Sequence, residues 1–200
     1  MNKIFFTSDT HFSHEFIAKK RGFSSIEEHD NFLIEQWNSV VDNGDCIYIL
    51  GDFIWNKADE EHILKQLNGQ KYVILGNHDK IGKHNEQIYN KYLIWYRTQH
   101  LLKIKNGENI PSTKIFLYHY PIEVWDSQHY SSYHFYGHVH GDCQHLKMRT
   151  DIPRRYDVGV DTNEYKPITF EEIVMKLKEQ NLYETNYKEI LRKRDENEKI

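Results

Sequence analysis

Acidic, amide and imidazole side chains stand directly after the apolar, strand-like stretches of this sequence. The most compact case is Gly76-Asn77-His78-Asp79, which follows the apolar stretch Lys71–Leu75. Similar steps occur elsewhere, and the polar side chains at the ends of these stretches are Asp9, His11, Asp52, Asn77, His78, His119, His138 and His140. Because parallel strands present the residues at their carboxyl ends to one crevice, we expect these side chains to converge.

Such a cluster favours bound metal. Two carboxylates, one amide and five imidazoles would be expensive to bury together without a strong partner, and divalent cations provide one. Nitrogen and oxygen ligands without thiolate suit Mn²⁺, Fe, Zn²⁺ or Ni²⁺ better than Ca²⁺ or Mg²⁺. The set is too large for one tetrahedral ion but suits two ions that share a carboxylate, a device for phosphoester cleavage at a separation of roughly 3.5–4 Å. We therefore predict two divalent ions, with manganese as the first choice.

The spacing within two pairs supports convergence. Asp9 and His11 are two residues apart, as are His138 and His140, so in extended backbone both members of a pair point the same way. Glycines on either side of the second pair allow a tight loop close to the ions.

Strand-like and helix-like segments alternate in the first half of the chain. The expected strands there are residues 4–7, 46–50 and 72–75, and the expected helices are residues 25–41 and 58–67, with a short helix before Gly22. This order favours a parallel sheet covered by helices, which is an α/β arrangement. The second half is richer in strands, and we expect them at residues 101–105, 110–117, 133–136 and 156–160, the first two joined by a turn at 106–107.

One domain is expected over residues 1–200. Thr169 is the expected cap of a helix that begins near Pro167, and a charged, helical tail is expected from about residue 182. The net charge of −4 gives no sign of a strongly basic nucleic-acid binder. The two cysteines, Cys46 and Cys143, have no zinc spacing, and no apolar run reaches the roughly 18 residues that span a bilayer. We expect a cytoplasmic protein with no membrane contact, and the sequence leaves its oligomeric state open.

The order of these motifs resembles the calcineurin-like metallophosphoesterase superfamily. The blocks that carry the resemblance are Asp9-x-His11, Gly51-Asp52, Gly76-Asn77-His78-Asp79, His119 and Gly137-His138-x-His140. The first block, from Ser8 to His14, is similar to that of small bacterial and phage members. The resemblance implies four layers, in which two stacked mixed β-sheets are flanked by helices.

The resemblance also implies a role for each residue. The first ion would be held by Asp9, His11, Asp52 and His140, and the second by Asp52, Asn77, His119 and His138, with Asp52 bridging. His78 would bind a phosphate oxygen or protonate the leaving alkoxide, and Asp79 would orient the His78 imidazole. The implied activity is that of an enzyme, a hydrolase that cleaves a phosphomonoester or phosphodiester with a hydroxide that both ions activate.

The substrate is the less determined part of this expectation. A small nucleotide or cyclic nucleotide fits a compact chain with aromatic residues near the motifs. Phe53-Ile54-Trp55 follows Asp52 where the protein phosphatases of the superfamily have Asp-Arg-Gly, which disfavours that branch. The alternatives are a non-catalytic metal-binding scaffold on the same fold and a nuclease acting on nucleic-acid ends.

Several residues near the motifs have two readings each. His14 is either an edge residue of the metal site or a helix cap, and Asp157 and Asp161 are more simply explained as loop-structuring residues. The run Lys19-Lys20-Arg21 is expected to be a solvated charged surface rather than a guide for an anionic substrate. The aromatic residues near the motifs could stack on a substrate, but packing in the core or at the rim of the fold is the simpler interpretation for each one. These residues are Phe53, Trp55, Tyr120, Trp125 and Tyr133. Surface positions are expected for most of the five histidines that have no special setting, which are His29, His62, His84, His100 and His145.

Overall fold

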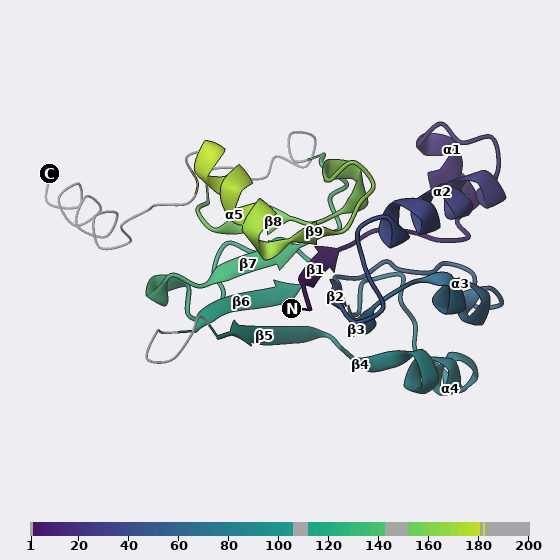
Figure 1. Cartoon of the computed structure of the whole chain (residues 1–200), viewed down its shortest axis with the longest axis horizontal. Coiled ribbons are helices and arrows are strands. Elements are labelled where there is room, and N and C mark those ends of the chain that lie inside the picture. The colour runs from purple at the N-terminus through teal and green to yellow at the C-terminus, as the bar shows by residue number, and fades with distance from the viewer. Residues whose placement is uncertain (1, 106–111, 143–151, 181, 183–200) are drawn as a thin grey trace, which may run out of the picture.

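Two β-sheets pack against each other in this computed structural model, which describes residues 2–105, 112–142, 152–180 and 182 (Figure 1). The strand order of the first sheet is β4-β3-β2-β1-β9 and that of the second is β5-β6-β7-β8. The strands of the first sheet are β1 (Ile4–Thr7), β2 (Cys46–Ile49), β3 (Gln70–Ile74), β4 (Leu93–Arg97) and β9 (Ile168–Thr169). Those of the second are β5 (Gln99–Ile104), β6 (Thr113–Tyr118), β7 (Tyr133–Tyr136) and β8 (Arg155–Asp157).

Both sheets are mixed. Strands β1 to β4 run parallel and β9 is antiparallel to β1, while β5 is antiparallel to β6 and the rest of the second sheet is parallel. Helices flank the sheets, namely α1 (Glu15–Lys20), α2 (Ile26–Asn38), α3 (Glu60–Gln66), α4 (Lys83–Tyr92) and α5 (Phe170–Glu179). The predicted class of two mixed sheets with flanking helices is therefore confirmed.

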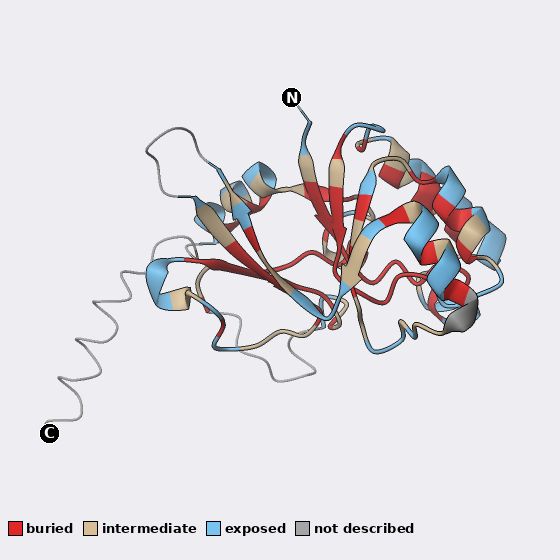
Figure 2. Cartoon of the chain, turned by 90° about the horizontal axis from the view of Figure 1, so that it is seen from below, coloured by how far each residue is buried: buried red, intermediate tan, exposed pale blue. Residues whose placement is uncertain are grey.

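Alternation along the first sheet divides the core into two layers. In β1, Phe5 packs under the helices and Phe6 packs between the sheets, and in β3 the same division separates Val73 from Ile74. Because consecutive strand residues point to opposite faces, a strand buried on both sides is mostly apolar, as residues 4–6 of β1 and 47–49 of β2 are. Figure 2 shows the buried residues concentrated in these strands and on the inner sides of the helices.

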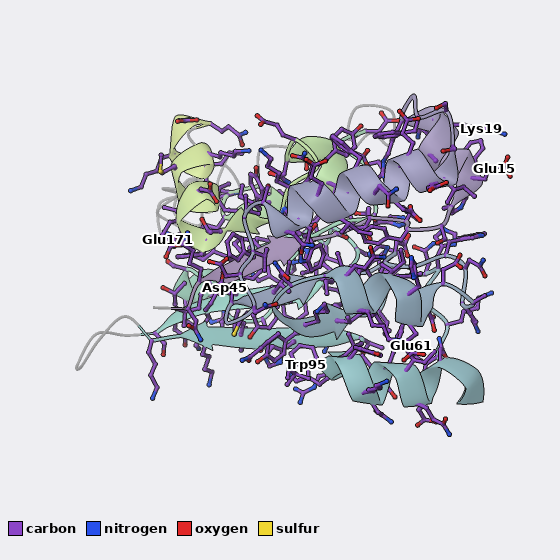
Figure 3. All side chains as sticks on the ribbon, turned by 45° about the vertical axis from the view of Figure 1, so that its right-hand side comes forward. Glu15, Lys19, Asp45, Glu61, Trp95 and Glu171 are labelled. Carbon is purple, nitrogen blue, oxygen red and sulfur yellow. The ribbon has the colours of Figure 1, made fainter. Side chains whose placement is uncertain are left out.

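Side-chain caps begin helices α2 and α5, and hydrogen bonds between side chains join α3 to α4. Ser25 accepts a hydrogen bond from the Glu28 amide and begins α2, and Thr169 forms a capping box with Glu172 at the start of α5. Glu61 of α3 accepts hydrogen bonds from Lys91 and Tyr92 at the end of α4 (Figure 3).

The sequence did not predict α4 or β4. Helix α4 has a polar sequence with few apolar anchors, and β4 begins at Leu93 directly after Tyr92 with no turn residue between them. The last expected strand is also shorter than predicted, because β8 ends at Asp157 and a 3-10 turn follows at Val160–Thr162. Cys46, the first residue of β2, is half-buried. The turn at 106–107, Cys143 and the tail beyond 182 lie outside the described residues.

The three central strands determine where the polar residues lie. Strands β1, β2 and β3 are adjacent, parallel and in register, so the segments that follow them leave the sheet at the same edge. Within the described residues, no helix is long and apolar enough to cross a membrane.

Candidate metal centre

The segments after β1 and β2 continue to pair beyond the strands. The amides of Asp9, His11 and Phe12 donate to the carbonyls of Gly51, Asp52 and Phe53, each at 3.0 Å. A corresponding bond joins the segments after β6 and β7, since the Gly137 amide donates to the His119 carbonyl at 2.9 Å. Backbone pairing of this kind places side chains from distant parts of the sequence at fixed separations.

The backbone around the candidate ligands is not extended, which corrects the expectation drawn from their spacing. Five of them have positive φ, with 56° at Asp9, 49° at His11, 51° at Asp52, 74° at His138 and 50° at His140. Non-glycine residues rarely adopt this left-handed region, and each costs on the order of 1 kcal/mol or more unless the surrounding structure compensates. Such strain is typical of sites where side chains are held for a function.

Two groups of ligand atoms result. Asp9, His11 and His140 form one group, and Asp52, His119 and His138 form the other, with the ligand atoms of each group within 4.8 Å of one another. The pair Asp9 and His11 therefore serves one group, whereas His138 and His140 serve different groups.

Asp52 lies between the groups. Its Oδ2 atom is 3.7 Å from Nε2 of His11 in the first group and 3.6 Å from Nε2 of His119 in the second. Asn77 reaches the second group, where its Oδ1 lies 3.0 Å from His119 Nε2. The seven residues predicted as metal ligands are thus brought together, and Asp52 occupies the position that a shared ligand needs.

Hydrogen bonds behind the ligands orient their ligand atoms. His119 donates from Nδ1 to the Leu50 carbonyl at 2.7 Å, which leaves Nε2 free to bind a cation. His140 places Nδ1 2.6 Å from Asp161 Oδ2, so its Nε2 faces His11 Nε2 at 3.3 Å. Both oxygens of Asp9 accept the His138 amide, at 3.0 and 2.9 Å.

Burial makes this cluster unfavourable without a cation. Asp9 is fully buried, and burial followed by repulsion from Asp157 raises the pKa of its carboxyl well above the usual value. Burial, and then the neighbouring His140, lowers the pKa of His11 to about 2. Neutral imidazoles and deprotonated carboxylates are the forms that bind metal, and a divalent cation would compensate the buried negative charge. The donor set therefore fits a pair of divalent ions, and it leaves the metal's identity open.

His78 and Asp79 occupy different places in the site. His78 is 42% exposed at its side chain, and its Nε2 lies 3.9 Å from Asp52 Oδ2. Asp79 accepts bonds from the backbone amides of Asp52, Phe53 and Gly76 at 2.8, 3.0 and 2.8 Å. No bond joins Asp79 to the His78 ring, both of which are described. We predicted that Asp79 orients the His78 imidazole. In the structure, its carboxylate instead joins the loop after β2 to the loop after β3.

Arg21 is a supporting residue that sequence reasoning missed. It was expected in a solvated run, but its side chain is only 4% exposed, whereas Lys19 lies on the surface in an ion pair with Glu15 (Figure 3). The guanidinium donates to Asp161 at 2.8 and 2.7 Å, to the Asp9 carbonyl at 2.7 Å and to the Thr10 carbonyl at 2.9 Å. It therefore ties the first ligand turn to the residue that orients His140.

His29 is also buried, contrary to the prediction of a surface position. Its Nε2 lies 3.0 Å from Arg21 Nη1 and its Nδ1 lies 2.8 Å from Asp30 Oδ1. The signal was available, since His29 precedes Leu33 and Trp37 at intervals of four and so lies on the inner face of α2. Of the other histidines expected at the surface, His62 is exposed and His100 is half-buried, while His145 and the His84 side chain lie outside the described residues.

The two aspartates near β8 have different roles. Asp157 accepts bonds from the amides of Gly159 and Gly141 at 2.8 and 3.3 Å, which is a loop-structuring arrangement. Asp161 does more than structure a loop, because it bonds both His140 and Arg21. Burial alone would raise its pKa, but these two bonds hold the pKa below its usual range.

Aromatic residues near the motifs divide into packed and exposed members. Phe53, Trp125 and Tyr133 are buried. Tyr120 is half-buried, and its ring centroid lies 4.7 Å from that of His138. Trp55 is 47% exposed, and its ring centroid lies 3.9 Å from that of His14. His14 caps α1 by accepting the Ile17 amide at 3.4 Å, as one of its two interpretations predicted. Its ring centroid also lies 5.5 Å from that of His11, but His14 belongs to neither ligand group.

Comparisons with known proteins agree with this geometry. The family model for calcineurin-like phosphoesterases matches residues 2–162. An uncharacterized protein of Methanocaldococcus jannaschii is 36% identical over 87% of this chain and 90% of its own length. The Gene 66 protein of Mycobacterium phage D29 is 27% identical over 80% of this chain and 89% of its own. The crystal structure of a protein of unknown function from Aquifex aeolicus has the same fold, with a TM-score of 0.64 and 24% identity over 86% of this chain and 98% of that chain.

Proposed function

The chain belongs to the calcineurin-like phosphoesterase family, and on this premise we propose that it is a hydrolase that cleaves a phosphomonoester or phosphodiester with two divalent ions. The observation that carries the proposal is the position of Asp52 Oδ2, 3.7 and 3.6 Å from a histidine nitrogen of each ligand group. A carboxylate between two such groups is what a shared ligand of two neighbouring ions requires.

In the proposed reaction, the ligand residues would hold the ions and His78 would bind the phosphate or donate a proton. The bound ions would supply charge stabilisation for the phosphate and activation of a water. The His78 side chain is exposed to solvent and also lies near Asp52, so it can donate to a phosphate oxygen or protonate the leaving alkoxide. Its position is fixed through the backbone, because the His78 amide donates to Asp52 Oδ1 at 3.0 Å.

The proposed substrate is a small nucleotide or cyclic nucleotide. The half-exposed Trp55 beside His78 supports this class, since a nucleobase can stack on an accessible indole. Manganese is the proposed metal, and iron, zinc and nickel are the alternatives that a donor set of carboxylate, amide and imidazole also admits. The competing functions are a non-catalytic metal-binding scaffold and a nuclease that acts on nucleic-acid ends.

Metal content and turnover decide between these functions. Purified protein loaded with Mn²⁺ should bind two ions per chain and hydrolyse p-nitrophenyl phosphate or bis(p-nitrophenyl) phosphate. The variant Asp52→Asn should lose both metal and turnover, whereas Asp126→Asn, at an exposed aspartate in the loop before Ser127, should lose neither. A fully loaded protein that hydrolyses no member of a broad phosphoester panel would favour the scaffold, and cleavage of oligonucleotides alone would favour the nuclease.

His78→Ala separates catalysis from metal binding. Loss of one general acid or phosphate contact is expected to lower kcat by about 10²–10⁴-fold. Metal content should stay near the wild-type value because His78 is in neither ligand group. His129→Ala is the matched control, since this histidine is exposed in the 3-10 turn Gln128–Tyr130. An equal loss of metal and activity in His78→Ala would contradict the role proposed for it.

A further inference from the structure

Trp55 is held rigidly beside the candidate metal centre and is still accessible. The Trp55 amide donates to the Phe12 carbonyl at 2.9 Å, and the preceding residue Ile54 forms a bridge with Phe12. These bonds extend the pairing that places Asp9, His11 and Asp52, so the backbone of Trp55 is fixed relative to the ligand groups.

The Trp55 ring lies close to two histidine rings. Its centroid is 3.9 Å from that of His14 and 5.0 Å from that of His78, while the side chain remains 47% exposed. Phe16 continues the row outward, with its ring centroid 6.4 Å from that of His14 and 69% of the residue exposed. Large aromatic side chains gain stability from burial, so a fixed indole left half-open beside a polar site is suited to a ligand with a flat apolar face.

The order of the side chains indicates which part of a substrate would meet the indole. His78 Nε2 lies 3.9 Å from Asp52 Oδ2, and the Trp55 ring centroid lies 5.0 Å from that of His78, with the two rings tilted by 55°. A phosphate bound beside the ligand groups and His78 would therefore have the Trp55 indole as a near neighbour. The organic part of such a phosphoester is the part that can meet the exposed indole.

We propose that Trp55 is the specificity-determining residue for the organic part of the substrate, and that it selects phosphoesters with a nucleobase by stacking on it. This inference rests on the proposed function for the location of the phosphate. His14 helps to hold the indole in place, because it contacts the indole ring and is itself fixed as the cap of α1.

Adenosine 5′-monophosphate and ribose 5-phosphate are a matched pair of probes, because they differ only in the base. Their dissociation constants for the Mn²⁺-loaded full-length protein would be measured by calorimetric titration. The wild-type protein should prefer the nucleotide, and Trp55→Ala should reduce this preference by roughly fivefold to a hundredfold, the range that base–aromatic stacking spans. Trp55→Phe should retain most of the preference, since phenylalanine keeps an aromatic face.

Tyr130→Ala is the control, at an aromatic residue that is 74% exposed in the turn Gln128–Tyr130. It should leave the ratio of the two dissociation constants unchanged. Thermal unfolding of each variant would confirm that it is folded. The inference is overturned if Trp55→Ala leaves the ratio unchanged, or if it weakens both probes equally, which would indicate a structural effect on the site.

Turnover separates this inference from the proposed hydrolysis. In an active enzyme, Trp55→Ala should raise KM for nucleotide substrates far more than it changes kcat. A loaded protein that cleaves no phosphoester but shows the Trp55-dependent preference in binding would end the hydrolase proposal and support the stacking role. An active protein whose nucleotide preference is indifferent to Trp55 would end the stacking role alone.

Discussion

Replacing Arg21 by alanine is expected to destabilise the protein and to weaken metal binding together. The guanidinium makes hydrogen bonds with Asp161, the carbonyls of Asp9 and Thr10, and His29, and its side chain is only 4% exposed. Its loss would leave the Asp161 carboxylate, which is 17% exposed, with His140 as its remaining side-chain partner. Breaking a buried pair from one side costs about 3–5 kcal/mol of unfolding free energy, and losing a residue that orients metal ligands costs about 10–100-fold in metal affinity.

The two effects need separate assays. Urea unfolding of the protein stripped of metal by a chelator gives the stability change without the contribution of bound ions. Competition with a chromophoric chelator gives the metal affinity. Arg21→Lys should fall between the wild-type protein and Arg21→Ala, because one ammonium group cannot span Asp161 and both carbonyls as the planar guanidinium does.

Lys19→Ala provides the control from the same segment. Lys19 is 66% exposed at its side chain and forms a surface ion pair with Glu15, so its loss should change stability by less than about 1 kcal/mol. The reasoning is refuted if Arg21→Ala resembles Lys19→Ala in both assays. It is refuted in part if stability falls but metal affinity does not, since Arg21 would then support the fold without positioning the ligands.

Two further predictions concern a buried histidine and a close backbone contact. Burial lowers the pKa of His134 to about 4 from 6.5, so the unfolded chain binds more protons between these values, and stability should fall by about 3 kcal/mol as the pH drops from 6.5 to 4. Urea unfolding at several pH values should show a shallower loss for His134→Gln, and identical pH profiles would contradict this. Gly137→Ala should lower metal affinity at least about tenfold and cost about 1–3 kcal/mol, because the added methyl group would collide with the side chains of Ser8 and Asp9. Chelator competition measures the metal affinity and urea unfolding measures the stability. Wild-type values in both assays would show that the segment after β7 can shift to accommodate the methyl group.

The sequence by itself determined the elements that have strong local signals. Strand β1 could be placed from its continuous apolar run, and the starts of α2 and α5 from the caps Ser25 and Thr169. These signals are local, because burial on both faces demands apolar residues and a helix start demands a side-chain acceptor. The order of the motifs likewise pointed to the seven candidate ligands, through its resemblance to the calcineurin-like superfamily.

Only the tertiary structure decided how those ligands are held. The left-handed backbone at Asp9 and His11, the burial of Arg21, and the loop-bridging role of Asp79 all depend on contacts between segments far apart in the chain. Charge alone could not distinguish the exposed Lys19 from the buried Arg21, because which one meets Asp161 depends on how α1 sits against the loop after β8. Helix α4 and strand β4 were missed for the same reason, since their stability comes from packing against α3 and β3 rather than from a pattern of their own.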